Sequence, residues 1–193
     1  MEVAAPTRDK LLDAAAQLFY EQGYSATSMD QVRQAAGVSN GSLYHHFPTK
    51  AQLADALYVQ TLHDFHGALL APIARDVTAE AGVKALVRAH VNWVLKNPAR
   101  AALLHKLKRE GEVTDKSADI SAANTEAYAT LRAWVDRKTE AGEMRAVPFY
   151  LWMSLVFAPA MGLNARWTKE PNVNVPPKVR AALEHAAWMA VAP

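Results

Sequence analysis

The spacing of apolar residues is the feature that most constrains how this chain can fold. Along nearly the whole sequence, apolar residues recur every three or four positions, and no stretch sustains the two-residue alternation of a half-buried strand. A repeat of three and four places side chains on one face of a helix. The sequence therefore predicts an all-α protein whose helices pack through their apolar faces.

Capping residues, glycines and prolines predict where these helices begin and end. Ser, Thr or Asn followed by Gln or Pro is typical of a helix start, whereas Gly and Pro are typical of a stop. Roughly nine helices are expected, three short ones first and longer ones after. Their approximate ranges are 7–22, 29–36, 40–47, 50–70, 78–96, 98–110, 118–141, 148–167 and 177–190. The polar stretches 111–117 and 167–176 are expected to be loops.

Composition excludes several kinds of protein. Cysteine is absent, which rules out a disulfide framework, a thiolate metal site and a cysteine nucleophile. The first ten residues lack the apolar core of a signal peptide. The longest apolar stretch, near residues 149–163, is interrupted by Ser, Pro and Gly and is too short to span a membrane. We therefore expect a cytoplasmic protein without a membrane segment.

No arrangement of residues typical of catalysis is found. The sequence has no Gly-rich phosphate loop after a strand, no GxSxG turn and no HExxH helix. His63 and His66 stand three residues apart but lack a third metal ligand nearby in the sequence. We expect no catalytic residues, no bound metal and no cofactor, so the chain is not expected to be an enzyme.

Net charge gives no general argument for binding nucleic acid. The whole chain carries a formal charge of +2, and residues 1–50 hold four Lys or Arg against five Asp or Glu. The affinity of proteins for DNA comes largely from individual cations placed against phosphates. A DNA-binding function must therefore rest on where donors are placed.

A tight turn between two short capped helices lies near the N-terminus. Its residues are Ala36-Gly37-Val38-Ser39. Gly37 permits the positive φ of a sharp turn, and Ser39 is suited to cap the helix that follows. Such a pair of helices is typical of the helix-turn-helix motif, whose second helix lies in the major groove of DNA.

The run AGVSNGSLYHHFPTK, from Ala36 to Lys50, followed by Leu53, resembles the DNA-binding signature of the TetR family. Upstream matches at residues 11–15, 18–19, 23–24 and 27 extend the resemblance to about 50 residues. The remainder resembles the family only in length, helix number and rhythm. Arg33 departs from the pattern, because a small residue is usual there, and an inward-pointing arginine would alter the packing of the second helix.

This resemblance implies a domain organisation and a mode of action. It implies a three-helix DNA-binding domain at residues 1–53 and a larger helical ligand-binding and dimerisation domain at residues 54–193, linked by a helix starting near residue 50. Members form homodimers through their last two helices. The expected partner is a near-palindromic operator in double-stranded DNA, from which a repressor is released by a small, largely hydrophobic or aromatic effector.

The expected DNA contacts lie around the starts of the second, third and fourth helices. They are Thr27, Ser28, Ser39, Asn40, Gly41, Ser42, Tyr44, His45 and Lys50. Asn40 can hydrogen-bond N6 and N7 of one adenine, and Gly41 permits close approach of the backbone. Thr27, Ser28 and Lys50 resemble family positions that contact phosphate.

Other residues of this region have roles that the sequence leaves open. Tyr44 resembles a tyrosine that touches a phosphate or a thymine methyl group, but half-buried packing is an alternative. Arg8 and Lys10 fit either a clamp on the DNA backbone or plain solvated charges. Leu43 and Phe47 are expected in the core, and His46 is expected to be wedged between the third and fourth helices.

A pocket for the effector is expected among aromatic and histidine residues of the C-terminal domain. The candidates are His90, Trp93, His105, Tyr128, Trp134, Trp152, Phe157 and Met161. Aromatic rings around an apolar cavity with a few polar tips suit a flat or hydrophobic ligand. The same residues are also typical of an ordinary core.

Two other functional classes remain as alternatives. One is a DNA-binding architectural or interaction protein that responds to no small molecule, which a fully packed C-terminal core would favour. The other is an enzyme that keeps the helix-turn-helix as a relic, which the missing acid–base and metal arrangements disfavour.

Overall fold

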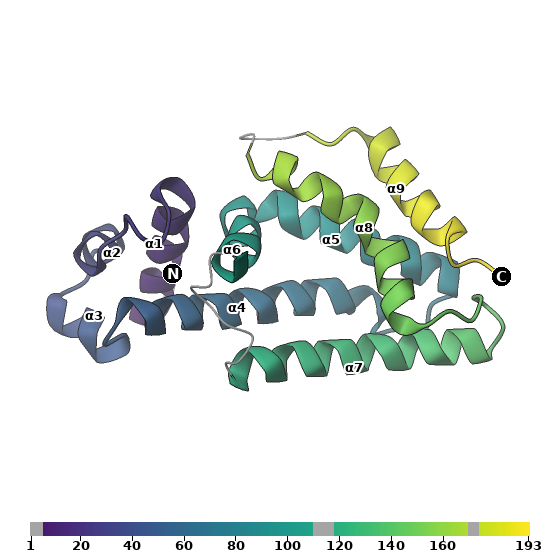
Figure 1. Ribbon diagram of the computed structural model, residues 1–193, viewed down its shortest axis with the longest axis horizontal. Helices are drawn as coiled ribbons and strands as arrows, with labels where there is room; N and C mark the ends of the chain where they lie inside the picture. The colour runs from purple at the N-terminus through teal and green to yellow at the C-terminus, as the bar shows by residue number, and fades with distance from the viewer. Residues whose placement is uncertain (1–5, 110–117, 170–173) are drawn as a thin grey trace, which may run out of the picture. The chain divides into compact units, whose positions relative to one another are not determined.

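The computed structural model describes residues 6–109, 118–169 and 174–193 (Figure 1). These residues form nine α-helices and one turn of 3-10 helix, and the described part contains no strand. The helices are α1 (Thr7–Gln22), α2 (Met29–Ala36), α3 (Asn40–His46), α4 (Lys50–Leu70), η1 (Ala71–Ile73), α5 (Ala79–Lys96), α6 (Pro98–Arg109), α7 (Ala118–Glu140), α8 (Phe149–Trp167) and α9 (Pro177–Met189). The predicted all-α class is confirmed, and the observed α-helix ends lie within one residue of the expected ranges.

The backbone separates into two compact units. One contains the described residues of 1–62 and 99–121, and the other those of 63–98 and 122–193. Helices α4 and α7 each begin in the first unit and end in the second. The first unit therefore includes α6 as well as the N-terminal helices. The boundary between a DNA-binding domain ending at residue 53 and a ligand-binding domain starting at residue 54 stays a prediction.

The first unit is organised around α1, which packs against α2 and α3. Its inward face consists of Leu11, Leu12, Ala15, Ala16 and Phe19, all buried. Val32 of α2 and Leu43 of α3 are each 0% exposed. Burying one such side chain contributes about 1.5–3 kcal/mol, so three short helices can hold together through few residues.

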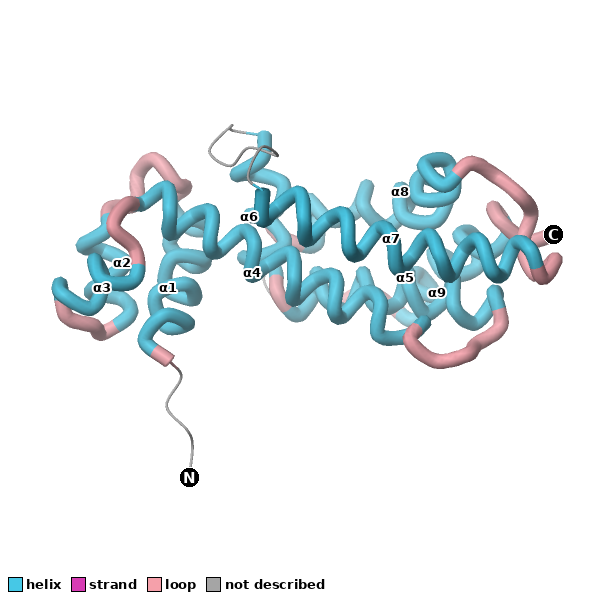
Figure 2. Tube along the Cα trace, turned by 90° about the horizontal axis from the view of Figure 1, so that it is seen from below, coloured by secondary structure: helices cyan, strands magenta, loops and turns pink. Residues whose placement is uncertain are grey.

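The second unit is organised around α5, which packs against α8 and α9. Figures 1 and 2 show these three helices side by side. The apolar face of α5 is buried along the helix, from Val83 to Val94. Gly82 of α5 lies against the indole of Trp134 on α7, where a Cβ atom would stand 2.3 Å from the ring carbon Cζ2. Glycine is thus required for α5 to come this close to α7.

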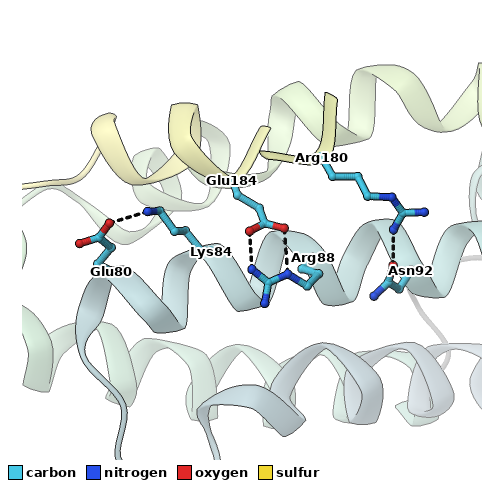
Figure 3. A network of polar contacts seen from close by, with 6 residues as sticks. All are labelled: Glu80, Lys84, Arg88, Asn92, Arg180 and Glu184. Atoms are coloured by element: carbon cyan, nitrogen blue, oxygen red, sulfur yellow. Dashed lines mark hydrogen bonds and ion pairs between the residues drawn. The ribbon is translucent and has the colours of Figure 1, made fainter. Parts of the chain in front are cut away.

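A row of polar contacts fastens α9 to α5 on the outer side of this packing (Figure 3). Nε of Arg88 donates to Oε1 of Glu184 at 2.9 Å, and Nη2 donates to the other carboxylate oxygen. Arg180 donates to the side-chain oxygen of Asn92 nearby. The Glu184 hydrogen bond is the main reason that the pKa of Arg88 lies above its usual value. These contacts hold one face of α9 on α5.

No helix in the described ranges combines the length and the hydropathy that crossing a membrane requires.

Candidate nucleic-acid interface

Helix α2 begins with the capping arrangement that the sequence predicts. The Ser28 hydroxyl accepts a hydrogen bond from the Gln31 N–H at 3.2 Å, and the Gln31 side-chain oxygen accepts from the Ser28 N–H at 2.7 Å. This capping box satisfies two of the amides that a helix start leaves unpaired. Ser28 itself is exposed, so the first turn of α2 is presented to the surroundings.

The turn between α2 and α3 depends on Gly37. Its φ of 65° and ψ of 36° are left-handed, a conformation that residues with a Cβ atom adopt only at a cost. The N–H groups of Gly37 and Val38 close the helix on the carbonyls of Gln34 and Arg33. This local geometry turns the chain sharply into α3.

Arg33, the departure from the family pattern, lies at the edge of α2. Its Nε donates to Oδ1 of Asp30 at 2.8 Å, and its Nη1 lies 3.5 Å from the carbonyl oxygen of Val38. The buried position of this helix is taken by Val32. An inward-pointing Arg33 is therefore excluded, and the arginine supports the turn from outside.

Helix α3 buries one side and exposes the other. Leu43 and Phe47 are buried and stand four residues apart, which places them on one face. Ser39 caps the helix by accepting from the Ser42 N–H at 3.2 Å. Asn40, Gly41 and His45 are exposed, and Ser42 is half-buried. The polar leading end of α3 is therefore displayed while its apolar face anchors it.

Two aromatic positions of α3 differ in how they fit the sequence-based expectations. Tyr44 is 47% exposed, so its ring is only partly packed. His46 is exposed, and the prediction that it is wedged between helices is wrong. The reason is geometric: Leu43 and Phe47 take the inward face of this short helix, and the residue before Phe47 points away from it.

Two expected phosphate contacts have their polar groups directed into the protein. Thr27 is 2% exposed, and its hydroxyl donates to the Gly23 carbonyl at 2.8 Å. Nζ of Lys50 lies 2.9 Å from the Thr27 carbonyl oxygen and 3.0 Å from that of Tyr24. Sequence reasoning could not find this, because it depends on the directions of carbonyls in an irregular turn.

Arg8 lies against the end of α3. Its guanidinium carbon stands 5.7 Å from the centroid of the Phe47 ring, a separation at which a cation is attracted to a ring face. The arginine therefore places a positive charge next to the residue that follows α3. Arg8 is itself exposed, so both alternatives for this residue, a clamp on the DNA backbone and a solvated charge, stay predictions.

The candidate effector residues separate into a buried group and a surface group. His90, Trp93, Trp134, Trp152 and Phe157 are at most 8% exposed. Tyr128 and Met161 are 49% and 48% exposed and lie outside the buried group. The side chain of His105 lies outside the described part of the structure.

The buried candidates form a continuous aromatic cluster within the second unit. Ring centroids lie 6.5 Å apart between Trp134 and Trp152, 6.2 Å between Trp152 and Phe157, and 6.1 Å between Phe157 and His90. Phe65 of α4 extends the cluster through contacts with His90 and Trp93. Sequence reasoning missed Phe65, which has no feature separating it from other core positions.

Some polar atoms inside this cluster have a hydrogen-bond partner and others do not. Nε2 of His90 lies 3.1 Å from Oδ1 of Asn164, and both residues are 4% exposed. Asn164 was not among the candidates, although a single amide in an otherwise apolar helix was a usable signal. The indole nitrogens of Trp134 and Trp152 are buried and have no hydrogen-bond partner among the described residues. Each buried N–H without an acceptor costs about 1–3 kcal/mol.

A hollow of about 300 Å³ adjoins this cluster. Its lining includes the buried Trp134 together with Leu70, Ile73, Thr130 and Arg137. The hollow therefore joins apolar surface to one cationic side chain within the second unit.

The N-terminal region matches a known family of regulators. Residues 11–57 fit the family model for bacterial regulatory proteins of the tetR family. The transcriptional repressor KstR2 of Rhodococcus jostii is 31% identical over 119 residues, which is 62% of this chain and 58% of that protein. The transcriptional regulator TtgR of Pseudomonas putida is 38% identical over 65 residues, or 34% and 30% of the two chains. The matches thus span less than two thirds of these relatives.

A solved structure shows the same fold over a longer range. A TetR family transcription regulator from Marinobacter aquaeolei VT8 is 25% identical, with a TM-score of 0.81 over 96% of this chain and 95% of that protein. Together, the sequence match over residues 11–57 and the shared all-helical fold show a TetR-like fold that carries the helix-turn-helix of the tetR family of bacterial regulatory proteins.

Proposed function

We propose that this protein is a transcriptional regulator that binds operator DNA through α3. The observation that carries the proposal is the division of α3 into two faces, one anchored by Leu43 and Phe47 and the other displaying Asn40 and His45. Side chains at the start of such a helix reach base edges in the major groove. Ser28 at the exposed start of α2, and Arg8 beside Phe47 at the end of α3, are suited to contact phosphates.

We also propose that it works as a homodimer through α8 and α9. Tyr150, Leu151 and Met161 of α8 and Met189 of α9 are large apolar residues that are 38–75% exposed. Apolar side chains gathered on two adjacent helices favour a protein interface. A two-fold dimer would offer two copies of α3 to sites about 34–36 Å apart on one duplex, which requires a near-palindromic operator.

The proposed effector is a small aromatic or hydrophobic molecule that carries a hydrogen-bond acceptor. The buried rings supply apolar contact, and the unpartnered indole N–H groups of Trp134 and Trp152 supply donors that an acceptor would satisfy. Such a ligand shifts DNA affinity only if it binds one conformation better than another. Release of a repressor from DNA is the proposed outcome.

Selection of duplexes from a randomised pool by the purified full-length protein tests the DNA-binding proposal. We expect enrichment of near-palindromic sites, and Asn40→Ala should relax preference at one base position by about 1–3 kcal/mol. Asn174→Ala, at an exposed asparagine before α9, is the matched control. Enrichment of no sequence, or an unchanged motif with Asn40→Ala, contradicts the proposal.

A DNA-binding protein without an effector is the second candidate, and the close packing of the buried rings favours it. A panel of aromatic ketones and carboxylic acids distinguishes the two. An effector should lower DNA affinity in the wild type and lose this effect in Trp134→Phe, which removes the N–H but keeps a ring. Trp188→Phe on α9 is the control. DNA binding that no compound alters supports the second candidate.

A further inference from the structure

The turn between α1 and α2 is gathered around one ammonium group. Nζ of Lys50, the first residue of α4, lies 2.9, 3.0 and 3.5 Å from the carbonyl oxygens of Thr27, Tyr24 and Ser25. The same nitrogen stands 4.3 Å from the centroid of the Tyr24 ring. Lys50 therefore binds three carbonyls of one turn, although it follows the residues of that turn by 23–26 positions in the sequence.

These contacts use the donors that lysine has. An ammonium has three N–H groups and no acceptor, and three carbonyl oxygens lie around this one. The ring face of Tyr24 covers it on a further side, where the attraction is electrostatic. A phosphate could be reached only by giving up one of these partners.

The turn that Lys50 holds leads directly into the start of α2. The Tyr24 carbonyl also accepts the Thr27 N–H at 3.1 Å, and the Thr27 hydroxyl donates back to Gly23. The next residue, Ser28, caps α2 and stands at the exposed end proposed to face the DNA backbone. Fixing the turn therefore fixes the direction in which Ser28 and the first amides of α2 point.

We propose that Lys50 is a positioning residue, which orders the α1–α2 turn and so aims the start of α2 at a phosphate, and that it does not pair with a phosphate itself. The DNA part of this inference rests on the proposed function. It replaces the role that the family resemblance implies for Lys50.

The salt dependence of DNA binding separates positioning from direct contact. Each phosphate that a cation neutralises contributes about 0.9 to the slope of log affinity against log salt concentration. On a selected duplex, we expect Lys50→Met to weaken binding about tenfold with the slope unchanged. Lys96→Met, at an exposed lysine of α5, should alter neither quantity. Binding is compared below the unfolding temperature of every variant.

The Lys50→Arg variant gives a second, opposite expectation for the two roles. Arginine pairs well with phosphate, but its planar fork cannot converge on three carbonyls of one turn as a compact ammonium does. We therefore expect Lys50→Arg to bind no better than Lys50→Met. A slope that falls by about one unit in Lys50→Met, or affinity restored by Lys50→Arg, would overturn the proposal.

Amide hydrogen exchange tests the positioning step without DNA. Lys50→Met should speed exchange in the segment 24–31 at least about threefold, while exchange within α1 stays as in the wild type. Unchanged exchange in this segment overturns the inference whatever the DNA result. Faster exchange in a protein that binds no duplex would leave the ordering of the turn intact and refute the proposed function instead.

Discussion

Gly82 shows how a single atom limits the packing of α5 on α7. A Cβ atom at this position would lie 2.3 Å from Cζ2 and 2.8 Å from Cη2 of Trp134, and that ring is itself buried beside Trp152. Gly82→Ala should therefore lower the free energy of unfolding by about 1–3 kcal/mol. Chemical denaturation of the purified protein measures it.

The matched control is Gly67→Ala. Gly67 is an exposed glycine within α4 where an added Cβ atom meets nothing within 4 Å. Its replacement should be neutral or stabilise by about 0.5–1 kcal/mol, because alanine favours helix. Equal effects of the two substitutions would contradict the close contact at Gly82.

The sequence predicted which residues of α3 are exposed, but not which side chains form hydrogen bonds with the backbone of the turns. Leu43 and Phe47 follow from helical spacing, since an interval of four places them on one face. The orientation of Lys50 does not follow, because it depends on carbonyls at positions 24–27 that no periodicity encodes. The prediction that His46 is buried was wrong for a related reason. The motif places a histidine here, but the direction of its side chain depends on where α3 ends.

The start of α5 is held by a carboxylate from the segment after α7. Oε2 of Glu143 accepts the Ala79 N–H at 2.7 Å, and its Oε1 accepts from Nζ of Lys138 at 3.1 Å. The hydrogen bond from Ala79, and then the one from Lys138, lower the pKa of Glu143 below its usual 4.5. The ionised carboxylate is therefore favoured by the folded protein.

This arrangement predicts a pH dependence of stability. Because the pKa is lowered on folding, the contribution of Glu143 is present above its usual pKa and is lost as the pH falls through the folded value. Glu143→Gln should reduce stability at pH 7 and flatten its decline on acidification. Glu140→Gln, at an exposed position on α7, is the control for denaturation followed from pH 7 to 3. Parallel acid profiles for wild type and Glu143→Gln would contradict the assignment.

The polar contacts between α5 and α9 predict a measurable coupling free energy between Arg88 and Glu184. Arg88 and Glu184 form a two-bonded pair in which the arginine side chain is 55% exposed, so solvent screens it and a coupling of about 1 kcal/mol or less is expected. A double-mutant cycle with Arg88→Met and Glu184→Gln measures it through unfolding free energies. A coupling free energy near zero would mean that the Arg88–Glu184 pair does not help to hold α9 on α5.

Helix ends were predictable because capping is local, whereas contacts between helices were not. Asn97 illustrates the limit: an asparagine before a proline is typical of a helix start, but its side-chain amide donates back to the Trp93 carbonyl at the end of α5. Arg100 of α6 donates to Asp13 of α1 at 2.7 Å and lies 3.5 Å from the Thr61 hydroxyl. Such pairings explain why α6 groups with the N-terminal helices, and local periodicity carries no information about them.

At the scale of the whole molecule, the proposed regulation needs a connection between two units that share helices. Helix α4 begins at Lys50 in the first unit and reaches Phe65 and the aromatic cluster in the second. A ligand that alters packing around Phe65 would therefore act on the same helix whose first residue holds the α1–α2 turn. In the proposed homodimer, contact through the exposed apolar residues of α8 and α9 would bring the second copy of α3 that a near-palindromic site requires.

Footprinting of a selected duplex, combined with native mass measurement of the complex, tests most directly whether α3 reads DNA as a pair. We predict two chains per duplex and two protected patches on one face about one helical turn, or roughly 10 base pairs, apart. Both patches should be lost in Tyr44→Ala with Asn40→Ala. A complex with a single chain, or uniform protection along the duplex whatever its sequence, would contradict the proposed mode of binding.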